Sequence, residues 1–125
     1  MLATCMLSVF RDIKAPYSAV EAWGYDRFVG GRAAIVLLPG LTGLLSQLQP
    51  NAAVLDVGCG GGHLLSAIAA RNAGFEVTGI DLNEAQVRRA MLRLKSFGAR
   101  ASVRQGSALA LPFSDRTFDA VISVT

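Results

Sequence analysis

Residues 53–62 read AVLDVGCGGG, an apolar run that contains one aspartate and ends in a glycine-rich turn. The run is short and rich in β-branched residues, which predicts a buried strand over Ala53–Val57. After the turn, apolar side chains recur on one helical face: Leu64, Leu65, Ile68 and Ala69. A strand, a glycine-rich turn and a helix in this order are typical of a parallel α/β sheet that binds a ligand at the carboxyl ends of its strands.

The same alternation continues downstream of this unit. Residues 75–80 predict a second buried strand, which ends at Asp81. Asn83 is expected to cap the next helix, because Gln86 follows at the spacing of a capping box. Gly98 is expected to end that helix. Its predicted buried stripe consists of Val87, Ala90, Met91, Leu94 and Phe97, and its predicted solvent-facing arginines are Arg88, Arg89 and Arg93.

Two further strands are predicted over residues 101–104 and 118–124. The strands are apolar throughout rather than alternating, which indicates a parallel sheet covered on both faces. The sequence therefore predicts an α/β fold, a Rossmann-like doubly wound parallel sheet with three α/β/α layers. We expect two parts, an N-terminal helical cap segment over 1–50 and the core over 51–125. In the first part, leucines at helical spacing predict a helix with a kink at Pro39–Gly40.

Composition excludes several classes of protein. Apolar residues make up 52% of the chain and charged residues 17%, so intrinsic disorder is excluded. The net charge is +3 and the basic residues are scattered, so we expect no nucleic-acid partner. The longest apolar stretch, residues 33–45, is shorter than the roughly 18 residues of a membrane span. Cys5 and Cys59 lack metal-ligand spacing, which favours a cytoplasmic protein without a metal site or disulfide.

The glycine turn discriminates between two classes of ligand. A dinucleotide-binding fingerprint that starts at Gly58 needs a glycine at position 63, which is His63. The carboxylate of Asp56 would also repel a pyrophosphate. An NAD(P)-dependent oxidoreductase is therefore a less favoured alternative. The pattern suits a ligand with cationic groups and no phosphates, and S-adenosylmethionine, with a sulfonium and an ammonium, fits this description.

Three segments in order, VLDVGCGGGHLL, VTGIDLNEAQVRRA and GSALALPFSDRTFDAVISV, resemble the class I S-adenosylmethionine-dependent methyltransferases of the small-molecule type. The resemblance covers about residues 53–125. It implies a methyltransferase that uses S-adenosyl-L-methionine and a small-molecule methyl acceptor. It also implies a set of cofactor-binding residues: Asp56, Gly58, Gly60, Gly62, Asp81, Leu82, Ser107 and Ala108.

The resemblance implies a role for each of these residues. The three glycines would line the methionine end of the cofactor, and Asp56 would orient its amino group. Asp81 would accept both ribose hydroxyls in a charge-assisted hydrogen bond. Leu82 would flank the adenine, and the Ser107–Ala108 loop would meet its edge. Ser107 stands where the family commonly has an acid, and a neutral acceptor makes a bond roughly half as strong. No residue is assigned as a catalytic base.

The resemblance also implies the strand order 3-2-1-4-5-7-6, in which the fourth strand is interior. The sequence stops at Thr125, directly after that strand, so we expect a core that lacks its C-terminal strands. Residues 118–124 would then form an apolar edge with unpaired backbone groups, through which the isolated chain would self-associate. An inactive or binding-only fragment of such an enzyme is the second functional hypothesis.

Overall fold

The computed structural model describes residues 5–6 and 39–124 of the chain. These residues form a five-stranded sheet in which every neighbouring pair of strands is parallel. Its spatial order is β1-β5-β2-β3-β4. The strands in chain order are β1 (Cys5–Met6), β2 (Ala53–Val57), β3 (Glu76–Asp81), β4 (Ala101–Gln105) and β5 (Ala120–Ser123). The four strands after residue 50 thus have the predicted 3-2-1-4 order, and the Rossmann-like α/β fold is confirmed.

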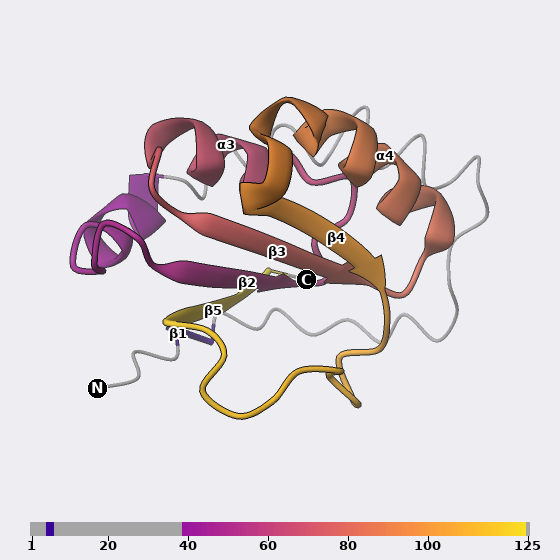
Figure 1. Ribbon diagram of the computed structural model, residues 1–125. Coiled ribbons are helices and arrows are strands. Elements are labelled where there is room, and N and C mark those ends of the chain that lie inside the picture. The colour runs from indigo at the N-terminus through magenta and orange to yellow at the C-terminus, as the bar shows by residue number, and fades with distance from the viewer. Residues whose placement is uncertain (1–4, 7–38, 125) are drawn as a thin grey trace.

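The direction of the chain decides which face each connection covers. The path from β2 through β3 to β4 moves one way across the sheet, so right-handed crossovers place α3 (His63–Arg71) and α4 (Glu84–Leu94) on the same face. The path to β5 returns to the other side of β2, and its connection, residues 106–119, crosses the opposite face (Figure 1). Among the described residues, the helices lie on one face only. The strand order reverses between β2 and β5, and such a switch point is where ligands bind in α/β sheets.

Each face of the sheet has its own apolar cluster. On the helical face, Val54, Val77 and Val103 contact the buried residues of α3 and α4. On the opposite face, Leu55, Val57 and Ile80 are buried against Phe113 and Phe118 of the 106–119 connection. Every strand between neighbours therefore buries alternate side chains on the two faces, as the uninterrupted apolar runs predict.

The predicted helix after Asp81 is confirmed, with corrections to its end and to the exposure of some of its side chains. Asn83 is the N-cap, and its side chain accepts a hydrogen bond from the backbone N–H of Gln86. Val87, Ala90 and Leu94 are buried as expected, but Met91 is 51% exposed, because it lies at the margin of the stripe. The α-helix ends at Leu94 rather than at Gly98, because a short 3-10 helix, η2 (Lys95–Arg100), follows it and contains Gly98 at a φ of 63°.

The N-terminal part is described only from Pro39 onward, apart from β1. Residues 39–45 are helical, and Leu41 and Leu45 are buried in the cluster on the helical face. The predicted helical residues before Pro39 lie outside the described residues, and the boundary at residue 50 stays a prediction. No helix within the described ranges is long and apolar enough to cross a membrane.

The prediction of an unpaired edge at the fourth core strand is wrong. The outer edge of β5 pairs with β1, in the register Cys5↔Ile122 and Met6↔Ser123. The strand is also shorter than predicted, since it starts at Ala120 rather than Phe118. Phe118 packs edge-on against Phe113, with 4.9 Å between the ring centroids. An N-terminal segment thus supplies the parallel neighbour that we expected only from residues beyond Thr125.

Candidate functional site

The glycine turn, residues 58–62, lies at the carboxyl ends of β2 and β3, beside the switch point between β2 and β5. Gly58, Gly60 and Gly62 all have positive φ values, of 77°, 53° and 80°, which side chains with a Cβ adopt only at a cost. The N–H groups of Gly58 and Cys59 both donate to the carbonyl of Ile80, at 2.8 and 3.0 Å. These two bonds tie the turn to the end of β3 and bring it next to Asp81.

Asp81 connects the turn to the start of α4. Its Oδ2 accepts from the N–H of Gly60 at 2.8 Å, and its Oδ1 accepts from the N–H of Asn83 at 2.8 Å. An ionised carboxylate has about four lone-pair sites, so each oxygen retains the capacity to accept a further hydrogen bond. The carboxylate is therefore both a structural link and an oriented acceptor for two hydroxyl groups.

Asp56 is the buried carboxyl of the site. It is 2% exposed, and its Oδ1 has no hydrogen-bond partner among the described residues. Burial raises its pKa from the ordinary 3.8 to about 7, and the nearby charge of Asp81 contributes to this rise. A buried acceptor without a donor is costly. A cationic donor at this position would both satisfy the oxygen and stabilise the ionised form.

The glycines of the turn have two different surroundings. A Cβ added to Gly60 would meet no atom of the described residues within 4 Å, so these residues leave open space beside this part of the backbone. A Cβ added to Gly62 would lie 3.0 Å from the Cβ of Ala90, so Gly62 is required for the close packing of the turn on α4. Only the first of these positions borders space that a ligand could occupy.

The segment predicted to meet adenine is also held at the end of β3. The N–H of Gly106 donates to the carbonyl of Asp81 at 3.0 Å, and Gln105 Nε2 donates to the carbonyl of Leu82 at 2.9 Å. The Leu82 side chain is 54% exposed. Ser107 Oγ accepts from the N–H of Leu109 at 3.1 Å, and Ala108 is exposed. One bond within its own loop thus engages Ser107, while the hydroxyl retains a proton and a second lone pair.

Two residues at this end of the sheet were not predicted as part of the site. Arg93 was expected to face solvent, but it is half-buried and donates a hydrogen bond to the carbonyl of Gly61 in the turn. Leu109 is 98% exposed on the loop that contains Ser107. No local sequence signal distinguishes Arg93 from Arg88, because its contact lies 32 residues away along the chain.

Cys59 lies within the turn, but its thiol is unreactive. Burial raises the pKa of its thiol, and the carboxylates of Asp56 and Asp81 raise it further. The protonated thiol is a poor nucleophile, and its Sγ occupies the space beside Gly79, where an added Cβ would lie 2.7 Å away. Cys59 is therefore a packing residue.

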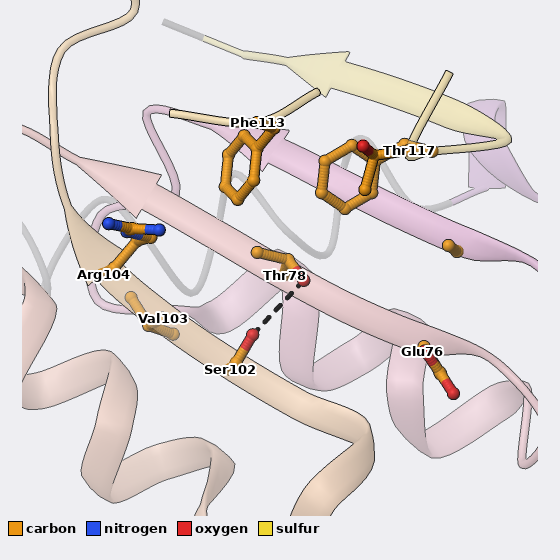
Figure 2. Close-up of a pocket in the computed structure, with 9 residues that line it drawn as sticks. Glu76, Thr78, Ser102, Val103, Arg104, Phe113 and Thr117 are labelled. Atoms are coloured by element: carbon orange, nitrogen blue, oxygen red, sulfur yellow. Dashed lines mark hydrogen bonds between the residues drawn. The ribbon is translucent and has the colours of Figure 1, made fainter. Parts of the chain in front are cut away.

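A separate cavity of about 320 Å³ is lined by Phe113 and Phe118, which pack on the face of the sheet opposite α3 and α4. Figure 2 shows Thr78 and Ser102 side by side on β3 and β4, with a 3.3 Å hydrogen bond between their hydroxyls, and Phe113 above them. Arg104 lies with its guanidinium carbon 5.8 Å from the centre of the Phe113 ring. None of the predicted cofactor-binding residues lines this cavity, so it is distinct from the glycine turn.

Similarity to known proteins agrees with the geometry at the turn. A family model described as a methyltransferase domain matches residues 54–125, more than half of the chain. The chain belongs to this methyltransferase family. The predicted kinship with class I S-adenosylmethionine-dependent methyltransferases is confirmed.

Three individual methyltransferases are similar to this chain over about two thirds or more of its length. Sterol methyltransferase-like 2 of Botryococcus braunii is 39% identical over 100 residues, which are 78% of this chain and 25% of that protein. The 2-methyl-6-phytyl-1,4-hydroquinone methyltransferase of Synechocystis sp. is 45% identical over 82 residues, 66% of this chain and 25% of that protein. A methyltransferase from Geobacter sulfurreducens, solved with S-adenosyl-L-homocysteine, matches with a TM-score of 0.56 and 30% identity over 68% of this chain and 34% of that chain. The chain thus spans about a quarter of the length of these curated relatives.

Proposed function

We propose that this protein is an S-adenosylmethionine-dependent methyltransferase that acts on a small, largely apolar acceptor. The observation that carries the proposal is the pair of carboxylates at the glycine turn. Asp81 is fixed by two backbone N–H groups and has lone pairs to spare, and the buried Oδ1 of Asp56 has no donor within residues 5–6 and 39–124.

The residues present fit the cofactor chemically. The ribose of S-adenosylmethionine offers two hydroxyl donors to Asp81, and its ammonium offers a charged donor to Asp56. The open space at Gly60 admits the methionine end. Leu82 supplies an exposed apolar side chain beside Asp81 for the adenine, and Ser107 offers a hydroxyl at its edge.

In this proposal the protein contributes orientation rather than covalent chemistry. When bound, S-adenosylmethionine supplies an activated methyl group on its sulfonium. Asp81 and the turn fix the position of the cofactor, because both are tied to the end of β3 by backbone hydrogen bonds. Fixed placement of two reactants is a major source of rate acceleration. No side chain of the described residues is assigned a proton-transfer step.

Two observations support an apolar acceptor. The matched relatives bear names of sterol, squalene, botryococcene and hydroquinone methyltransferases. On the loop that contains Ser107, Leu109 is 98% exposed and Leu111 is 40% exposed. An apolar acceptor bound beside this loop would remove apolar side chains of this kind from water.

The proposal is tested by binding and by transfer. We expect S-adenosylhomocysteine to bind in a calorimetric titration and NAD not to bind. A labelled-methyl assay against sterol, squalene and hydroquinone acceptors is then expected to show transfer to at least one of them. Binding of NAD in place of S-adenosylhomocysteine would refute the proposal, whereas binding without any transfer would favour a binding-only protein.

A further inference from the structure

The glycine turn is held by contacts at three successive residues, one to the end of β3 and two to α4. The N–H of Gly60 donates to Asp81, the last residue of β3, at 2.8 Å. The carbonyl of Gly61 accepts from the guanidinium of Arg93, near the end of the same helix. The Cα of Gly62 lies against Ala90, where an added Cβ would be 3.0 Å away. Gly61 and Gly62 therefore both contact the C-terminal half of α4.

The peptide between Gly61 and Gly62 is held by both of its polar groups. Its carbonyl oxygen accepts from Arg93, and its N–H donates to the carbonyl of Cys59 at 3.0 Å. This matters because glycines at positive φ have many alternative conformations of similar energy. The bond from Arg93 is charge-assisted and therefore stronger than the neutral bonds within the turn.

We propose that Arg93 is a positioning residue for the cofactor site, one that fixes the Gly61 carbonyl and thereby the backbone that faces the ligand. This inference rests on the proposed function, since the ligand is taken to be S-adenosylmethionine or its product. Arg93 does not itself touch the cofactor in this proposal. It acts through the Gly60–Gly62 backbone.

Arg88 on the same helix provides a matched control. Its Nη1 lies 2.6 Å from Oε1 of Glu84, and both side chains are well exposed, at 60% and 69%. Exposed pairs of this kind contribute little to stability. Replacing Arg88 removes the same charge from the same helix without touching the turn.

The experiment compares Arg93→Met, Arg93→Lys and Arg88→Met in the whole protein. Methionine keeps an unbranched apolar stem and good helix propensity, so only the guanidinium is lost. We expect Arg93→Met to weaken S-adenosylhomocysteine binding about tenfold or more, as for loss of a hydrogen bond to a charged group. Lysine keeps the charge and the ability to donate from its ammonium group, but without the planar fork, so it should restore part of the affinity. Arg88→Met should bind like the wild type.

Amide hydrogen exchange in the ligand-free protein gives the second readout. Residues 58–62 are expected to exchange faster in Arg93→Met, while β3 keeps the exchange of the wild type. Wild-type affinity in Arg93→Met, or a loss of affinity with unchanged exchange in the turn, overturns the inference. If the wild type itself fails to bind S-adenosylhomocysteine, the proposed function fails, and the exchange of residues 58–62 still decides whether Arg93 orders the turn.

Discussion

Replacing Asp56 by asparagine is expected to stabilise the protein, and to do so more at high pH. Burial holds the pKa of this carboxyl at about 7 in the folded state, against 3.8 ordinarily. The folded protein therefore binds more protons than the unfolded chain between these two values, and ionisation lowers the stability of the fold as the pH rises through that window. Asparagine has nearly the same shape and cannot ionise, so the variant is free of this loss.

The magnitude follows from the size of the shift. Each pKa unit corresponds to about 1.4 kcal/mol, so a rise from 3.8 to about 7 amounts to about 4 kcal/mol in total. Part of this destabilisation is already present at mildly acid pH. From the linkage relation, ionisation of Asp56 lowers the free energy of unfolding by about 3 kcal/mol more between about pH 5 and about pH 8. The stability difference between Asp56→Asn and the wild type should grow by this amount over that interval.

The assay is urea unfolding of both proteins at these two pH values, with the free energy of unfolding taken from linear extrapolation. Asp115→Asn, which removes an exposed carboxylate of the 106–119 connection, controls for the loss of one negative charge. A difference between Asp56→Asn and the wild type that is the same at both pH values would contradict the reasoning, because it would mean that Asp56 ionises at the same pH in the folded and unfolded chain.

Two glycine substitutions test whether a glycine leaves room for the ligand or allows close packing of the protein. Gly60→Val should abolish S-adenosylhomocysteine binding in a calorimetric titration, because the valine side chain would enter the open space beside the turn and the φ of 53° disfavours a β-branched residue. Helical content by far-UV circular dichroism should stay nearly unchanged. Retained binding would show that the ligand does not use this space. Gly79→Ala should lower the free energy of unfolding by about 1–3 kcal/mol, because its Cβ would lie 2.6 Å from Leu65 Cδ1 and 2.7 Å from Cys59 Sγ. A variant as stable as the wild type in urea would show that these two side chains move aside at no cost in stability.

Local features of the fold could be predicted because the signals lie close together in the sequence. The Asn83 cap and its bond to Gln86 depend on residues three positions apart. The apolar stripe predicted the helix itself, although the α-helix ends at Leu94, before Gly98. The alternation of strands and helices predicted a parallel α/β sheet, and the resemblance to the class I methyltransferases implied the order of its core strands. The prediction that Met91 is buried was wrong, because a helical period defines the centre of a buried face more sharply than its margin.

Long-range contacts could not be predicted from these patterns. The pairing of Cys5–Met6 with β5 joins segments at opposite ends of the chain, and neither the length nor the composition of β1 signals a strand. The bond from Arg93 to Gly61 depends on how α4 packs against the turn. For the same reason the resemblance implied a ligand-binding role for Asp56, but no sequence pattern could show that its Oδ1 is buried with no donor in the described part of the chain.

A calorimetric titration of S-adenosylhomocysteine into the wild type and into Asp81→Ala tests most directly whether the cofactor lies at the glycine turn. Loss of a hydrogen bond to a charged group costs about 1.5–3 kcal/mol, so the variant should bind at least tenfold more weakly than the wild type. Asp81→Asn, which keeps one acceptor oxygen, should fall between the two. Equal affinity in a folded Asp81→Ala protein would remove Asp81 from the site and contradict the placement of the cofactor at this turn.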